Sequence, residues 1–148
     1  MIEGQCQCKS IRFSLRSIPF ECCYCHCSIC RKLTGSNFGT YGTVPKEDFK
    51  WLQGEELISN YNQNENLQRS FCSKCGSPIK SVHKLDPDNV FISIGCIDTT
   101  ISDLKIEYQQ FTESKASWHR LDPEIKPHKK WPKWALERAK RNAQLDDQ

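Results

Sequence analysis

The sequence predicts a mainly β domain of short antiparallel strands, stabilised by metal ions and followed by a short C-terminal helix. Three observations lead to this fold class. Short runs of alternating apolar and polar residues are separated by turn-forming residues. Seven of the ten cysteines lie in three tight clusters, a spacing typical of zinc sites. Close to the C-terminus, apolar residues recur with helical spacing.

Three strands are expected in the first part of the chain. Apolar residues alternate with polar ones in residues 11–15, and again in residues 20–24 up to the second cysteine cluster. Residues 38–44 mix glycine, threonine and tyrosine and indicate a third strand.

Two hairpins are expected in the middle of the chain. Residues 57–61 and 67–71 would pair across a polar run. Residues 77–83 and 90–97 would pair across a turn at Asp86-Pro87-Asp88-Asn89. Frequent turns between short strands favour an antiparallel arrangement.

Two segments are expected to be helical. Residues 28–33 would form a turn of helix directly on the second cysteine cluster. Near the C-terminus, Pro132 suits the first position of a helix, and apolar residues follow at helical spacing from Ala135 to Ala143.

Length and composition limit the class of protein. At 148 residues we expect one zinc-binding domain, residues 1–125, with a basic, partly helical extension, residues 126–148. No apolar run could span a membrane and the polar start is no signal peptide, so we expect a cytoplasmic protein. In that reducing compartment clustered cysteines indicate metal sites, and a disulfide scaffold is the alternative.

The net charge gives little support to a nucleic-acid partner. The formal value of +3 counts every cysteine as neutral. Seven bound thiolates and two Zn²⁺ ions would bring it to about zero, because ligating cysteines lose their protons.

One metal site is expected to be structural. The sequence Cys72-x-x-Cys75-Gly76 has the form of a zinc knuckle, in which glycine allows a tight turn of the backbone around the sulfurs. A knuckle supplies two ligands, and Cys6 and Cys8 can supply the other two. Such a site would tie the N-terminus to the middle of the chain.

The second site is expected to be catalytic. Cys25, Cys27 and Cys30 can place three thiolates on one ion and leave a free position. Two alternatives remain: an iron–sulfur cluster, or a closed structural site completed by one of three nearby residues, Cys22, Cys23 or His26.

These motifs together resemble the glutathione-dependent formaldehyde-activating (Gfa-like) family, which includes centromere protein V. The resemblance covers roughly residues 4 to 120. It rests on Gly4-x-Cys6-x-Cys8, Cys25-His26-Cys27-Ser28-x-Cys30-Arg31-Lys32, Gly35, Phe71-Cys72-x-x-Cys75-Gly76-Ser77 and, more weakly, Ser114-Lys115-Ala116-Ser117-Trp118. One departure is Lys9, which stands where the family usually has glycine.

The resemblance implies an Mss4-like fold of coiled antiparallel sheets with two zinc ions per chain. It implies a structural zinc on Cys6, Cys8, Cys72 and Cys75 and a catalytic zinc on Cys25, Cys27 and Cys30. The implied activity is that of a carbon–sulfur lyase resembling S-(hydroxymethyl)glutathione synthase. Its partners would be a small-molecule thiol, with glutathione expected, and a small aldehyde such as formaldehyde.

Several residues near the second cluster could serve such a reaction. Arg31 and Lys32 could bind glutathione carboxylates, or they could be a solvated pair of charges. Lys115 is a further candidate for this role. His26 could move protons beside the metal or could be structural.

Two other functions are compatible with the sequence. A methionine sulfoxide reductase-like enzyme would use Cys96 as nucleophile, although a lone cysteine is more often a small buried apolar residue. A non-catalytic zinc module could use the basic, tryptophan-containing residues 126–134 to bind a protein or nucleic acid. We prefer a solvated helix whose tryptophans pack on the domain, so no nucleic-acid partner is expected.

Overall fold

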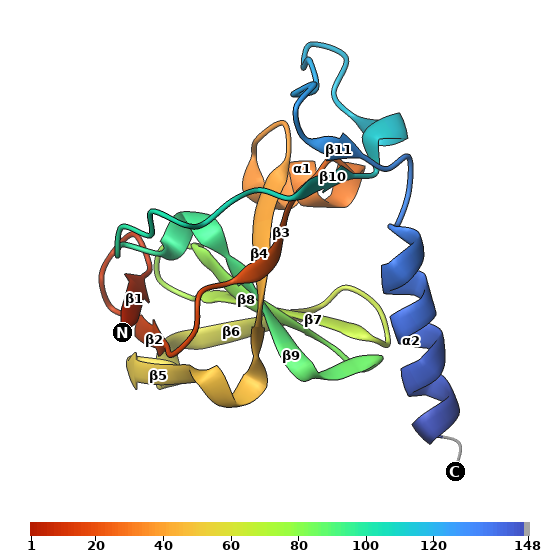
Figure 1. Ribbon diagram of the computed structural model, residues 1–148. Coiled ribbons are helices and arrows are strands. Elements are labelled where there is room, and N and C mark those ends of the chain that lie inside the picture. Colours follow the sequence, from red (N-terminus) through yellow and green to blue (C-terminus); the bar gives the residue numbers. More distant parts are fainter. Residues whose placement is uncertain (147–148) are drawn as a thin grey trace. The chain divides into compact units, whose positions relative to one another are not determined.

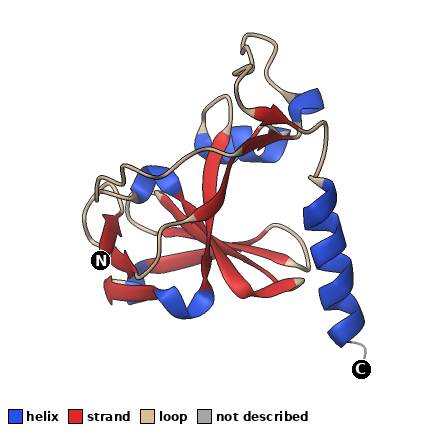
Figure 2. Ribbon diagram, viewed as in Figure 1, coloured by secondary structure: helices blue, strands red, loops and turns tan. Residues whose placement is uncertain are grey.

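The computed structural model describes residues 1–146, so Asp147 and Gln148, the last residues of the expected extension, lie outside the described residues. The chain separates into two compact units. The first comprises Met1–Phe20 and Gly42–Leu104, and the second comprises Glu21–Tyr41 and Lys105–Gln148. The strands form two sheets and a helix follows them, so the predicted mainly β class is confirmed (Figures 1 and 2).

The first unit contains a three-stranded antiparallel sheet in the order β1-β2-β5. Its strands are β1 (Ile2–Gln5), β2 (Arg12–Leu15) and β5 (Phe49–Gln53). In this register Gly4 faces Phe13. A Cβ at Gly4 would lie 2.3 Å from the Phe13 ring, so glycine is required for this close approach.

The same unit contains an antiparallel run of strands in the order β9-β8-β7-β6. These are β6 (Ile58–Asn62), β7 (Leu67–Cys72), β8 (Pro78–His83) and β9 (Asp86–Ser93). Inward-facing side chains form one apolar core, whose fully buried aliphatic and aromatic members are Ile11, Phe13, Leu15, Val44, Ile79, Val90 and Ile92. Two cysteines of the expected structural site, Cys6 and Cys72, belong to this core.

The second unit is built around β3 (Phe20–Cys25), which pairs in parallel with β10 (Tyr108–Gln110). β10 in turn pairs in parallel with the short β11 (Lys126–Pro127). Helix α1 (Ser28–Thr34) leads into β4 (Gly39–Pro45), which passes from this unit into the first.

Helix α2 (Lys133–Asp146) ends the described chain. Its Arg138 forms two hydrogen bonds with the Glu21 carboxylate, at 3.0 and 3.1 Å, and Trp134 packs edge-on against Tyr108. No helix among residues 1–146 is both long and apolar enough to cross a membrane. Short 3₁₀ turns complete the structure at Lys46–Asp48, Glu55–Leu57, Ile94–Cys96 and Thr112–Ser114.

The structure corrects three local predictions. The hairpin turn lies at residues 84–85, and residues 86–89 belong to β9. Asp86 pairs with His83 of β8, and the Asn89 side chain donates a hydrogen bond to the Asp86 carboxylate at 2.7 Å. Residues 94–96 form a 3₁₀ turn in place of the expected strand end. Pro132 is not the first residue of α2 but lies just before it. Its carbonyl accepts hydrogen bonds from the amides of Ala135 and Leu136.

Candidate metal centres

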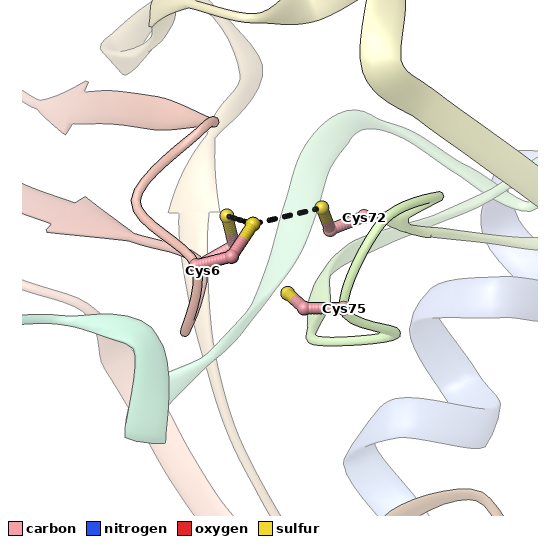
Figure 3. A group of neighbouring side chains, drawn as sticks. Cys6, Cys72 and Cys75 are labelled. Atoms are coloured by element: carbon pink, nitrogen blue, oxygen red, sulfur yellow. Dashed lines mark hydrogen bonds between the residues drawn. The ribbon is translucent and has the colours of Figure 1, made fainter.

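Four cysteine sulfurs converge in the first unit. The Sγ atoms of Cys6, Cys8, Cys72 and Cys75 all lie within 4.8 Å of one another. Figure 3 shows Cys6, in the loop after β1, near Cys72, the last residue of β7, and Cys75, in the turn that follows β7. The chain thus brings together the four residues expected at the structural site.

Local backbone geometry positions these sulfurs. The amide N–H of Ile11 donates to the Cys6 sulfur at 3.3 Å, and the amide of Cys6 donates to the Ile11 carbonyl at 3.1 Å. Gly76 has a φ of 78°, which favours glycine, and its N–H donates to the Cys72 carbonyl at 2.8 Å. This tight turn returns the chain so that Cys75 faces Cys72.

The spacing of the sulfurs fits tetrahedral zinc. With a Zn–S distance of about 2.3 Å, neighbouring sulfurs would lie about 3.8 Å apart. The Cys8 sulfur lies 3.5 Å from that of Cys6 and 3.8 Å from that of Cys72. Hydrogen bonding by the Ser77 hydroxyl lowers the pKa of Cys75 to about 5, while burial raises the pKa of Cys6 to about 11. A metal cation would stabilise all four as thiolates.

Three further sulfurs converge in the second unit, at the junction of β3 and α1. Cys25 ends β3, Cys27 is the N-cap residue of α1, and Cys30 lies in its first turn. Their Sγ atoms lie within 4.8 Å of one another. The Cys30 N–H donates to the Cys27 sulfur at 3.3 Å, so this thiol replaces the usual capping oxygen.

The electrostatics of this group favour thiolate character at one position. Hydrogen bonds from the thiols of Cys25 and Cys30, together with the capping N–H, lower the pKa of Cys27 to about 2. The hydrogen bond between the Cys25 thiol and Cys27 raises the pKa of Cys25, and burial raises it further. The Tyr41 hydroxyl hydrogen-bonds to the Cys30 sulfur. The donor set and its spacing fit a thiophilic cation such as zinc.

The residues weighed as fourth ligands do not join this group. Among residues 1–146, only Cys25, Cys27 and Cys30 were found in it. The Cys23 thiol hydrogen-bonds to Tyr108 and is buried. His26 is fully buried, and its Nε2 lies 3.3 Å from the Gln109 Oε1. The described residues therefore supply three sulfurs to this group, the number of protein ligands that an open zinc site would use.

His26 has mainly structural contacts. The Gln109 Nε2 donates to the carbonyls of Asp122 and Ile125, so its Oε1 accepts and the His26 Nε2 carries the proton. The His26 ring stacks on His119, with centroids 5.3 Å apart. Burial lowers the pKa of His26, which favours the neutral ring. Sequence reasoning missed Gln109 and His119, since neither belongs to a recognisable motif.

A basic pocket of about 350 Å³ lies along the end of α1. Arg31 and Lys32 line it together with Gly35, Ser36, Asn37 and Trp118. The Arg31 Nε is buried without a hydrogen-bond partner among the described residues. Trp118 is 75% exposed. Arg31 and Lys32, the two cations predicted from the sequence, therefore line one pocket. The Lys115 ammonium group instead donates a hydrogen bond to the His119 carbonyl at 3.1 Å.

The other candidate residues lie in different surroundings. The Cys96 thiol donates to the Pro78 carbonyl at 3.0 Å, and burial raises its pKa to about 11. Burial also raises the pKa of Cys22 to about 11. An activated nucleophile needs the opposite shift. In the basic segment, residues 128–130 accept backbone hydrogen bonds from residues 111–113.

Comparison with known proteins finds distant relatives of this sequence. A Halomonas elongata protein named "Putative glutathione-dependent formaldehyde-activating enzyme" is 28% identical over 130 residues, covering 82% of each chain. A Schizosaccharomyces pombe protein named as an uncharacterized lyase is 25% identical over 91 residues, covering 62% of this chain and 64% of that protein.

A solved structure and a family model complete the comparison. The crystal structure of a Rhodobacter sphaeroides protein matches with a TM-score of 0.58 and 17% identity, covering 68% of this chain and 91% of that one, which supports the fold alone. The sequence model of the family described as "Glutathione-dependent formaldehyde-activating enzyme" matches residues 1–114. The chain therefore belongs to the glutathione-dependent formaldehyde-activating enzyme family.

Proposed function

We propose that this protein is a zinc-dependent carbon–sulfur lyase that equilibrates a thiol such as glutathione and a small aldehyde with their S-hydroxymethyl adduct. The observation that carries the proposal is the group of three sulfurs at the start of α1, for which no fourth ligand was found in the described part of the chain. Seven thiolate ligands need a reducing environment, so the proposal includes a cytoplasmic location.

The two metal centres have different proposed roles. Cys6, Cys8, Cys72 and Cys75 would hold a structural ion, and Cys25, Cys27 and Cys30 would hold the catalytic one. Zinc in the second centre would supply a positive charge that favours the thiolate form of an incoming thiol. With three ligands from the chain, the fourth position on the ion would be left for the substrate thiol.

Charge is the main difficulty for a thiol substrate at this centre. Three thiolates on Zn²⁺ carry a net charge of −1 and repel a second anion. Arg31 and Lys32 follow the last ligand directly on α1 and line the basic pocket. We assign them to the carboxylates of glutathione, where a planar guanidinium can form two parallel hydrogen bonds.

The proposed reaction balances without an added oxidant or reductant. In the forward direction the sulfur forms a bond to the aldehyde carbon, and the thiol proton ends on the aldehyde oxygen. Binding the thiol at a fixed position beside the aldehyde lowers the entropic part of the barrier. The reverse direction breaks the same carbon–sulfur bond, which makes the enzyme a lyase.

Exchange NMR on mixtures of glutathione and formaldehyde tests the proposal. We expect the zinc-loaded protein to raise the exchange rate between free and S-hydroxymethyl glutathione in proportion to its concentration. Cys27→Ser should lose this acceleration while staying folded, and Cys96→Ser should keep it. An exchange rate equal to that of the protein-free mixture, at two zinc ions per chain, would remove the proposed reaction.

A further inference from the structure

Gln110 ends β10 directly beside the three-cysteine group. Its register partner on β3 is Cys25, and the His26 amide donates to the Gln110 carbonyl at 3.0 Å. Neighbouring strands lie about 4.8 Å apart. The Gln110 backbone is therefore fixed alongside the loop that carries the first two sulfurs of the group.

The Gln110 side chain lies on the same face of the sheet as the Cys25 side chain. Paired residues of neighbouring strands share a face, and so do residues two apart along one strand. The pair two residues earlier supports this direction, because the side chains of Cys23 and Tyr108 hydrogen-bond to each other. The Gln110 carboxamide thus extends from the sheet on the side of the three sulfurs.

This carboxamide contains an acceptor without a donor. Gln110 is only 6% exposed, and its Oε1 is buried without a hydrogen-bond partner among the described residues. The adjacent Gln109 differs, since its oxygen faces His26 and its nitrogen donates to two carbonyls. An unpaired buried polar group destabilises the folded state, so a ligand that completes this hydrogen bond gains affinity.

We propose that Gln110 contacts the substrate at the three-cysteine site, where its Oε1 accepts a hydrogen bond from the hydroxyl group of the S-hydroxymethyl adduct. This inference rests on the proposed function and adds a residue that distinguishes the adduct from the free thiol. Addition converts the aldehyde oxygen into a hydroxyl group, which can donate. The free thiol has no such hydroxyl on its sulfur substituent, so Gln110 favours the adduct.

Binding to the zinc-loaded chain of 148 residues tests this role without relying on turnover. Gln110→Met keeps a similar side-chain length and removes the acceptor. We expect its affinity for S-hydroxymethylglutathione to fall about tenfold, with its affinity for S-methylglutathione unchanged, since that ligand has no hydroxyl donor. Its zinc content and melting temperature should not fall, because the Gln110 Oε1 has no hydrogen-bond partner to lose among the described residues.

Gln109→Met is the matched control. It should lower the melting temperature, since it removes hydrogen bonds to His26 and to two carbonyls. Equal affinities of wild type and Gln110→Met for the adduct overturn the inference, as does an equal loss for both ligands. If wild type binds the adduct through Gln110 but does not accelerate exchange, the proposed reaction fails and the inference stands.

Discussion

Replacing one ligand in each metal centre should affect stability very unequally. We compare Cys75→Ser with Cys27→Ser, a matched pair because both residues are partly exposed. The structural centre joins segments 64 residues apart, from Cys8 to Cys72. The entropy of closing such a loop corresponds to about 4 kcal/mol of stability, whereas closing the short loop from Cys25 to Cys30 corresponds to about 2 kcal/mol.

The assay is denaturant unfolding in excess zinc, followed by circular dichroism, with metal content measured on the same samples. We expect each variant to lose one of two zinc ions. Cys75→Ser should lose about 4 kcal/mol of unfolding free energy or fail to fold, and Cys27→Ser should lose no more than about 2 kcal/mol. Equal losses, or a greater loss for Cys27→Ser, would refute the assignment of the stabilising role to the four-cysteine centre.

Three further substitutions test other parts of the structure. Lys9 has a φ of 62°, so Lys9→Gly should raise the unfolding free energy by about 1 kcal/mol, and no gain would argue against strain there. Gly4→Ala should lower it by about 1–3 kcal/mol because the new Cβ meets Phe13, while Gly95→Ala, with open space around its Cβ, should change it little. Arg31→Met should raise the KM for glutathione about tenfold at unchanged kcat and zinc content; an unchanged KM would exclude Arg31 from binding.

The predictable elements are those with a regular chemical pattern. Alternation identified β2 and β3, and ligand counting grouped Cys6 and Cys8 with the knuckle at Cys72 and Cys75. β1 was missed because a four-residue strand with a central glycine carries little pattern. β5 alternates only over Phe49, Lys50 and Trp51, and apolar Leu52 then interrupts the pattern, so its signal was short.

The remaining features depend on tertiary contacts. β10 consists of Tyr108, Gln109 and Gln110, and nothing in this polar triplet indicates a parallel pairing with β3. Gln109 is buried because it completes hydrogen bonds brought by distant segments. The residues at 86–89 have turn-forming character, yet they lie in β9, where the Asn89 side chain donates a hydrogen bond to the Asp86 carboxylate. The division of the chain at residue 125 stays a prediction.

Cadmium-113 NMR tests the central claim, an open three-thiolate centre that accepts a substrate thiol. With both centres loaded with cadmium, we expect two resonances, one typical of four sulfur ligands and one of three. Adding glutathione should move only the second toward the four-sulfur position, because the substrate supplies the missing ligand, and Cys27→Ser should remove that resonance. Two four-sulfur resonances before any thiol is added, or no change on its addition, would contradict the claim.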